Sequence, residues 1–324
     1  MRILLTILLT LGAFLASTGC HADPGHVRIA IFRGEELTPL AQALGHFRAQ
    51  QLDVEIHEVP SSSKAMEALF GGSVEIVAGG YDHAIRLAAE GRQARSFTVM
   101  TMRSPLGLVA SPKATRIRAI SDLKGAKVGI SAFGSSGHHF VHLLLHRHGL
   151  KPSDVQMVAT GGGHKVTVAS AEQGRVDAIV TLPVSQAVLR SRHAALTILA
   201  NGQTPDGTKE IFGVEEYPAI CLMAEIPWLE AHPDTARRMA RAMLHTLEWA
   251  RTHTPEEFQG KLGRTSGGAE EREGLRVTIE LCSRDGRMPL RGPEAVRDAV
   301  AVSYPRVRQV DVARTFTDEF VGGK

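Results

Sequence analysis

The sequence has few cysteines, few aromatic residues and no marked excess of charge of either sign. Three cysteines in 324 residues are too few for the disulfide framework of a small secreted domain. The 37 lysine and arginine residues nearly balance 34 aspartate and glutamate residues, for a net charge of +3, and they are scattered along the chain. A nucleic-acid binder gathers its basic residues into a stripe, so nucleic acid is not expected as a partner. Aromatic residues make up 5% of the chain, which leaves few rings to sandwich a heterocyclic ligand.

The remaining composition is that of an ordinary folded protein. Hydrophobic residues make up 43% of the chain and charged residues 22%, which is usual for globular proteins. A length of 324 residues exceeds the roughly 100 to 200 residues of one typical domain. We therefore expect two lobes.

The N-terminal segment has the pattern expected of a secretion signal. Met1-Arg2 is followed by an apolar run over residues 3–16, which is the length of a signal-peptide core rather than of a membrane span. Gly19-Cys20 resembles the lipobox of bacterial lipoproteins, in which the cysteine is acylated. We expect a signal peptide within residues 1–22, cleaved before Cys20 and followed by lipid attachment there. Ordinary cleavage after Ala22 is the alternative. The protein is then expected in the periplasm or on the outer face of the cytoplasmic membrane, held by its lipid anchor.

Short apolar runs alternate with helical patterns from Val27 onward. This βαβ rhythm predicts a mostly parallel sheet flanked by helices, and it restarts near Lys127. Residues 60–80 and 160–183 also echo each other, since each runs from a polar loop through a helix and a glycine turn to an apolar strand. The chain is therefore expected to contain two similar α/β units. Among the expected helices, one spans residues 38–50, and a long one is capped by Asp234 or Thr235 after Pro233.

Two crossing strands are expected to join the lobes, at residues 104–114 and within residues 201–218. These positions place the first part of lobe 1 at residues 27–108, lobe 2 at 109–210, and the completion of lobe 1 with the C-terminal helices at 211–324. Ligands of open α/β sheets bind outside the carboxyl ends of the strands. A cleft between the lobes is therefore the expected ligand site.

Five histidines between Ser131 and Leu150 raise the question of a metal site. His138 and His142 lie four residues apart and so share a helix face. The segment has no acidic ligand and no Cys-x-x-Cys, so we expect no metal site and no cofactor, with a metal-sensing protein as an alternative. The serines of the same segment lack the G-x-S-x-G spacing of a nucleophile elbow, so no catalytic residue is assigned.

The Gly/Ser loops that follow predicted strands suit a different role. Small residues let the chain turn tightly, and the free N–H groups at the start of the next helix bind an anion or a carbonyl. Ser135 and Ser136 stand in one such loop, and Ser62 and Ser63 stand in another. Helix capping alone also explains serines at these positions. Because such loops recur along the chain, a ligand cradle is favoured.

Five segments give the chain a recognisable order. They are residues 47–80, the stretch from Ile120 to Val158 with its D-L-K-G-x-x-V-G motif, and residues 174–184, 231–253 and 310–321. In order and spacing they resemble the substrate-binding proteins of bacterial ABC importers, in the nitrate/sulfonate/taurine branch whose members are labelled NMT1-like or sulfonate-binding. The resemblance covers nearly all of the mature chain.

This resemblance implies a two-lobe periplasmic-binding-protein fold of type II, in which each lobe is a mostly parallel sheet flanked by helices and the ligand cleft lies between the lobes. It also implies a monomer without enzymatic activity that captures a small polar solute, sulfonate- or taurine-like, by lobe closure and delivers it to an ABC permease in the inner membrane. The residues expected to line the site are Thr38, Ser62, Ser63, Gly80, Tyr81, Ser135, Ser136, Thr181 and Tyr217.

Glu35 and Glu36 in the loop after the first strand bear on the choice of solute. At the cleft, two carboxylates would repel a simple inorganic anion and favour a solute that also carries an ammonium group; the alternative is that both point to solvent. The few rings expected near the cleft include Phe133. An enzyme of pyrimidine or thiamine-precursor metabolism is a further alternative, because the NMT1 label is shared with such proteins. Whether Cys221 and Cys282 form a disulfide stays open.

Overall fold

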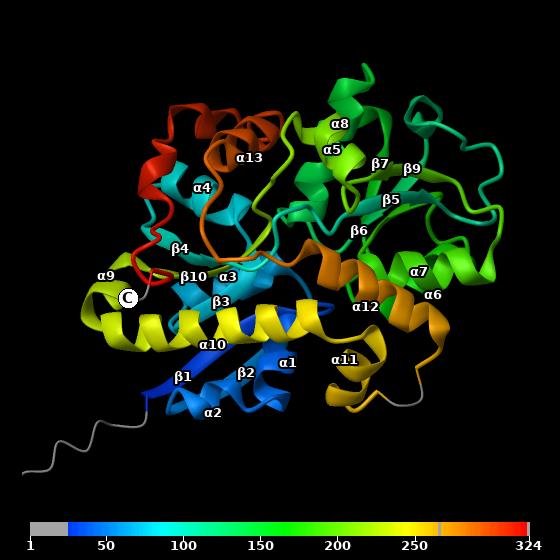
Figure 1. Cartoon of the computed structure of the whole chain (residues 1–324). Coiled ribbons are helices and arrows are strands. Elements are labelled where there is room, and N and C mark those ends of the chain that lie inside the picture. Colours follow the sequence, from blue (N-terminus) through cyan, green and yellow to red (C-terminus); the bar gives the residue numbers. More distant parts are fainter. Residues whose placement is uncertain (1–24, 265–266, 323–324) are drawn as a thin grey trace, which may run out of the picture.

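The computed structural model describes residues 25–264 and 267–322, which form two α/β lobes side by side (Figure 1). The expected signal peptide and the lipidation site at Cys20 lie outside the described residues. Each lobe is built on one mixed sheet of five strands, covered by helices. The expected α/β fold class with two lobes is therefore confirmed.

The sheet of lobe 1 has the strand order β2-β1-β3-β10-β4. Strands β1 to β3 run parallel, whereas β10 runs antiparallel to both of its neighbours. The strands are β1 (Gly25–Phe32), β2 (Leu52–Val59), β3 (Ile76–Gly80), β4 (Ala94–Val99) and β10 (Ile220–Glu225). Because β10 comes from far along the sequence, lobe 1 is completed only after the chain has returned from lobe 2.

The sheet of lobe 2 repeats this plan with the order β7-β6-β8-β5-β9. Here β5 is the reversed strand, antiparallel to β8 and β9, while β6 runs parallel to β7 and β8. The strands are β5 (Gly107–Ala110), β6 (Lys127–Ile130), β7 (Gln156–Ala159), β8 (Ala178–Thr181) and β9 (Ile198–Asn201). The two echoing stretches of sequence form equivalent units, α3 with β3 and α6 with β8.

Thirteen α-helices in the described part of the chain cover the sheets. In lobe 1 they are α1 (Leu37–Ala43), α2 (His46–Ala49), α3 (Ser62–Phe70), α4 (Asp82–Ala89), α9 (Ile226–Ala231), α10 (Pro233–Thr252), α11 (Pro255–Lys261) and α13 (Gly292–Ala301). In lobe 2 they are α5 (Ser136–Arg147), α6 (His164–Glu172), α7 (Pro183–Arg192) and α8 (Pro205–Phe212). Helix α12 (Ala269–Leu281) follows α11 in the chain but packs against α7 of lobe 2, as Figure 1 shows.

Two helix boundaries differ from the expectation. The single helix expected over residues 38–50 is divided into α1 and α2, because Gly45 adopts a left-handed conformation with φ of 75°. The long helix α10 has Pro233 at its first position and His232 as its N-cap, so neither Asp234 nor Thr235 caps it. Proline suits a first helical position because the N–H it lacks would be unpaired there.

Three chain segments lie side by side where the lobes meet: residues 99–102, 217–220 and 281–286. The Met100 N–H donates to the Ile220 carbonyl and the Met102 N–H donates to the Leu281 carbonyl, each at 2.8 Å. Backbone hydrogen bonds thus hold these three segments together where the chain passes between the lobes. This strip is the expected place for hinge bending.

Both cysteines of the described chain, Cys221 and Cys282, are buried free thiols. Burial raises the pKa of each thiol to about 12. They are therefore packed as small hydrophobic side chains rather than as reactive thiols. No helix among residues 25–264 and 267–322 is long and apolar enough to cross a membrane.

Candidate functional site

A cavity of about 100 Å³ lies between the lobes, several times the roughly 10–15 Å³ that one water molecule needs. Both lobes and the second crossing contribute to its wall. Side chains from the starts of α3, α4 and α5 meet there, since parallel strands of both sheets end at the cleft. The cavity therefore has the size and position to hold a small solute.

Six of the nine residues expected at the site line this cavity: Ser62, Gly80, Ser135, Ser136, Thr181 and Tyr217. Three others lie elsewhere. Thr38 is buried in α1 beside Glu35, the Ser63 hydroxyl turns back to Ser61, and the Tyr81 hydroxyl bonds to Thr315. Phe133 also lies away from the cavity wall and is 60% exposed.

Glu35 and Glu36 neither enter the cavity nor point to solvent. The Glu35 carboxylate accepts N–H bonds from Leu37 at 2.8 Å and Thr38 at 3.1 Å, so it caps the start of α1. Burial raises the pKa of Glu35 to about 7, against the lowering effect of these bonds. Glu36 forms an ion pair with Arg264 at 2.8 Å. The expectation that these two carboxylates select the solute is therefore wrong.

The serines at the start of α5 are already engaged within the protein. Ser135 is the N-cap, since its Oγ accepts from the His138 N–H at 3.3 Å and donates to the Ala132 carbonyl at 2.7 Å. The Ser136 hydroxyl donates to Asp82 Oδ1 at 2.6 Å, and this bond joins lobe 2 to lobe 1. Each hydroxyl has one proton, so neither is free to donate to a solute. The loop therefore contributes its backbone groups to the cavity wall rather than its hydroxyl protons.

Glycine at two positions allows the lobes to approach this closely. A Cβ on Gly80 would overlap both Ser136 Oγ and Asp82 Oδ1. A Cβ on Gly162 in lobe 2 would overlap the Pro60 carbonyl oxygen in lobe 1. The two lobes are thus in close contact at both positions.

Asp82 and His139 line the cavity but were missed by the sequence reasoning. Each is 8% exposed. Burial alone would raise the pKa of Asp82, but its interactions with His83 and His139, the Ser136 hydroxyl and the Arg86 charge hold the pKa below its usual value, so Asp82 is a carboxylate. Burial lowers the pKa of His139 to about 3, so its ring is neutral. The signal for Asp82 was its place two residues after the Gly79-Gly80 strand end.

A serine–histidine pair at the cavity has the wrong arrangement for nucleophilic catalysis. His83 Nε2 lies 2.9 Å from Ser62 Oγ, but His83 Nδ1 faces an Arg86 N–H at 3.4 Å rather than a carboxylate. An acceptor Nδ1 places the ring proton on Nε2, so His83 donates to Ser62. It therefore does not accept the serine proton as a catalytic base must.

The apolar part of the wall comes from α5, α8 and the second crossing. The Phe212 and Tyr217 rings stack with centroids 3.8 Å apart, and Phe140 lies 6.2 Å from Phe212. All three side chains line the cavity. Such rings contact the hydrocarbon part of a solute while the polar groups fix its orientation.

The histidine pair on α5 is occupied by its own hydrogen bonds. His138 Nδ1 accepts the Gly134 N–H at 3.2 Å, so His138 Nε2 carries the ring proton and faces His142 Nε2 at 3.1 Å. A metal ion at this point would have to replace that proton. Within the described ranges, no group of three or more His, Cys, Asp or Glu residues is arranged to hold a metal.

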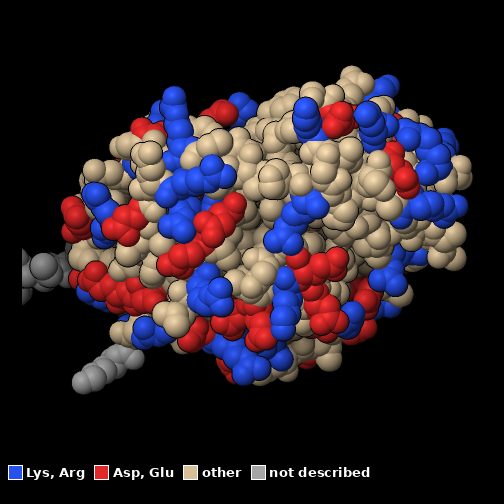
Figure 2. All heavy atoms as spheres, turned by 90° about the horizontal axis from the view of Figure 1, so that it is seen from above, with Lys and Arg blue, Asp and Glu red and all other residues tan. Residues whose placement is uncertain are grey.

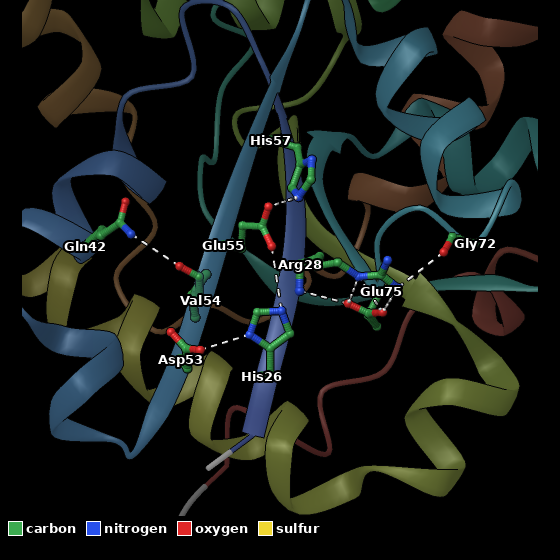
Figure 3. Close-up of polar contacts among 9 residues, drawn as sticks. All are labelled: His26, Arg28, Gln42, Asp53, Val54, Glu55, His57, Gly72 and Glu75. Carbon is green, nitrogen blue, oxygen red and sulfur yellow. Dashed lines mark hydrogen bonds and ion pairs between the residues drawn. The ribbon is translucent and has the colours of Figure 1, made fainter. Parts of the chain in front are cut away.

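A second polar cluster lies on one face of β1 and β2, away from the cavity (Figure 3). His26 Nδ1 is 2.9 Å from Asp53, and His57 Nε2 is 3.0 Å from Glu55. The hydrogen bond and charge of Asp53 raise the pKa of the exposed His26. The His26–Asp53 contact joins β1 to β2, whereas Glu55 and His57 both stand on β2. On the face seen in Figure 2, basic and acidic side chains are interspersed rather than separated into fields.

Comparison with known proteins gives one family and several similar structures. The family model described as NMT1/THI5 like matches residues 38–257. A structure from Bordetella bronchiseptica RB50 covers 92% of this chain and 96% of its own, with 29% identity and a TM-score of 0.85. No curated protein sequence matches the chain.

Two more distant structures share the fold. The alkanesulfonate-binding protein SsuA from Xanthomonas axonopodis pv. citri, bound to MOPS, is 18% identical with a TM-score of 0.71, covering 91% of this chain and 99% of its own. The periplasmic nitrate-binding protein NrtA from Synechocystis PCC 6803 is 11% identical with a TM-score of 0.70, covering 91% and 86%. The expected periplasmic-binding-protein fold is thereby confirmed.

Proposed function

The chain belongs to the NMT1/THI5-like family, and from this membership we propose that it is the extracytoplasmic solute-binding component of an ABC importer. It captures a small polar solute by closing its lobes and delivers the closed complex to a permease in the inner membrane. No covalent bond is made or broken. The proteins of known ligand that share its fold are named as binding proteins, which supports this assignment.

One feature supports the proposal most strongly: the cavity draws residues from both lobes, and hydrogen-bonded chain segments join the lobes beside it. A solute in this cavity touches both lobes only when they are closed. Its binding energy therefore favours closure, because a ligand shifts a conformational equilibrium by its differential affinity for the two states. The Ser62–His83 arrangement argues against the alternative of an enzyme on the same fold.

Sulfonates are the first solutes to consider, since the sulfonate- and nitrate-binding proteins share the fold. The starts of α3 and α5 both face the cavity, and their first backbone N–H groups have no partner within the helix. Such groups bind sulfonate, carboxylate or phosphate oxygens. The aromatic side chains of the wall suit an organic body better than a bare inorganic ion.

We place the mature protein in the periplasm or on the outer face of the cytoplasmic membrane, attached by a lipid at Cys20. This rests on the apolar run and the Gly19-Cys20 pair of the sequence. A lipid anchor would keep a monomeric binding protein close to its permease.

A thermal-shift screen of the purified protein tests the function. The screen covers alkanesulfonates, taurine, amino acids, nitrate, pyrimidines and divalent metals. A solute that binds only the folded protein raises its melting temperature by mass action. A shift that saturates with one solute class, without chemical turnover of that solute, supports the proposal. Conversion of a stabilising compound into product would instead establish an enzyme.

A further inference from the structure

Two buried hydrogen-bond acceptors on the cavity wall have no donor. They are Asp82 Oδ2 and His139 Nε2, which find no hydrogen-bond partner anywhere in residues 25–264 and 267–322. Both side chains are more than nine-tenths buried and line the cavity between the lobes. Leaving such atoms unpaired costs free energy, so a buried acceptor normally has a donor.

The hydrogen bonds of His139 fix which of its nitrogens is free to accept. His139 Nδ1 lies 2.6 Å from Ser303 Oγ, and the same hydroxyl donates to the Val300 carbonyl at 3.1 Å. A serine hydroxyl has only one proton, so both bonds form together only if His139 Nδ1 carries the ring proton. The His139 Nε2 atom then carries no proton, and its lone pair is available to accept a hydrogen bond inside the cavity.

Asp82 reaches the same region from the other lobe. Its Oδ1 accepts from Ser136, which lies three residues before His139 on α5, so the carboxylate and the imidazole face each other across the cleft. The second carboxylate oxygen of Asp82, Oδ2, has no hydrogen-bond donor among the described residues. An atom pair of this kind, one anionic and one neutral, is matched by a group that carries several N–H donors and a positive charge.

The start of α3 offers the opposite chemistry. Ser62 Oγ accepts a hydrogen bond from the N–H group of His83 Nε2. The hydroxyl proton of Ser62 is therefore free to donate into the cavity. The first N–H groups of α3 and α5 add further donors and a positive helix end. The cavity therefore offers both donors and the acceptor pair, with Phe140, Phe212 and Tyr217 also in its wall.

We propose that Asp82 and His139 are specificity-determining residues that select a solute carrying an ammonium group as well as an acidic end. This inference rests on the proposed function, since it concerns the solute of the same cavity. The ammonium group donates to Asp82 Oδ2 and His139 Nε2, and the acidic end binds at the start of α3. A solute without the amine leaves both acceptors unpaired and places its negative charge beside a carboxylate.

Matched pairs of probes test this by titration calorimetry on the mature protein. Taurine is compared with ethanesulfonate, and para-aminomethylbenzenesulfonate with toluenesulfonate. Each pair differs by the amine alone. The amine-bearing member is expected to bind at least about tenfold more tightly, as for a hydrogen bond to a charged group.

Asp82→Asn is the diagnostic variant, because asparagine keeps an acceptor for Ser136 but removes the charge. It is expected to abolish the preference for the amine while binding of the amine-free probe is retained or improved. Asp53→Asn makes the same chemical change on the exposed face of β2 and is expected to keep the wild-type preference. If Asp82→Asn does not fold, His139→Leu is used instead, and the preference must then fall by about threefold or more.

The outcomes separate this inference from the proposed function. Tighter or equal binding of the amine-free probes by the wild-type protein overturns the inference and leaves solute capture standing. Binding of none of the four probes also overturns it for acidic amines, and the wider thermal-shift screen then decides the function. If Asp82→Asn keeps the preference for amine-bearing probes, the Asp82 carboxylate does not recognise the amine, and the inference is overturned as well.

Discussion

The Ser136 hydroxyl at the start of α5 donates a 2.6 Å hydrogen bond to Asp82 Oδ1 at the start of α4. The two residues belong to different lobes, so this bond exists only when the lobes are closed. Gly80 makes it possible, because any side chain there would occupy the space of the bond. Closure therefore depends on a polar contact inside the cavity itself.

Ser136→Ala should favour the open state. A hydrogen bond to a charged group contributes roughly 1.5 to 3 kcal/mol, so the variant should bind the cognate solute about tenfold or more weakly. Small-angle scattering of the solute-free protein should show a larger radius of gyration. Ser135→Ala removes the α5 cap and the bond to the Ala132 carbonyl, both within lobe 2, and should lower stability by about 1 kcal/mol without that expansion. Identical scattering from Ser136→Ala and wild type would rule out the bond as a latch.

Gly162→Ala should hold the lobes apart. Its Cβ would overlap the Pro60 carbonyl oxygen of the other lobe, so solute affinity should fall by about tenfold as closure becomes incomplete. Gly161→Ala is the matched control, because Gly161 also has a positive φ but nothing lies within 4 Å of its added Cβ. Both variants should lose about 1 kcal/mol of stability through backbone strain. Equal affinities for the two variants would contradict the expected contact.

Stability should fall between about pH 4 and about pH 7 because of Glu35. Its pKa is raised to about 7 in the folded protein, whereas an unfolded glutamate has a pKa of about 4.3. Between these values the folded state binds more protons, so raising the pH removes stability. Glu35→Gln should flatten the decline and be roughly 1 to 3 kcal/mol more stable than wild type at the upper pH, measured by urea unfolding. Glu67→Gln, at an exposed carboxylate, should keep the wild-type slope.

Equimolar zinc should leave the melting temperature nearly unchanged. His138 Nδ1 accepts the Gly134 N–H, and the protonated His138 Nε2 faces His142. His138 therefore has no free nitrogen lone pair with which to bind a metal ion. Thermal unfolding with and without zinc measures this. A large zinc-dependent increase that disappears in the double variant His138→Ala, His142→Ala would establish a metal site.

Mass spectrometry of the protein from its host membrane should find Cys20 as the acylated first residue. The apolar run and Gly19-Cys20 motivate this expectation. Cys20→Ser should release the protein from the membrane fraction. An unmodified N-terminus at Asp23 would mean ordinary secretion.

Much of the fold could be predicted because short-range sequence patterns determine its helices and strands. Alternating apolar strands and helical patterns give the βαβ units, and the repeat of residues 60–80 in 160–183 gives two lobes. The reversed strand β10 pairs with β3 although more than a hundred residues separate them, because the chain passes through lobe 2 and back. The local sequence of β10 does not indicate such a distant partner. The kink at Gly45 was also missed, since an isolated glycine is compatible with a continuous helix.

The site could be predicted only where strand ends coincide with small polar residues. Ser62, Ser135 and Ser136 were found in this way. Asp82 was missed because a carboxylate in the first turn of a helix is ordinary, and only the facing lobe makes it part of a cavity. Glu35 was misassigned for the converse reason: its carboxylate turns back to the N–H groups of its own helix, which a sequence pattern does not show.

The two sheets share one strand order, so this chain has the form of a duplicated unit whose copies face each other across the cleft. The copies have diverged where they meet: Asp82 stands at the first position of α4, and Pro183 stands at the first position of the equivalent helix α7. Of these two residues only Asp82 lines the cavity. A charged group at the site has therefore arisen in one unit of the fold without a counterpart at the equivalent position of the other.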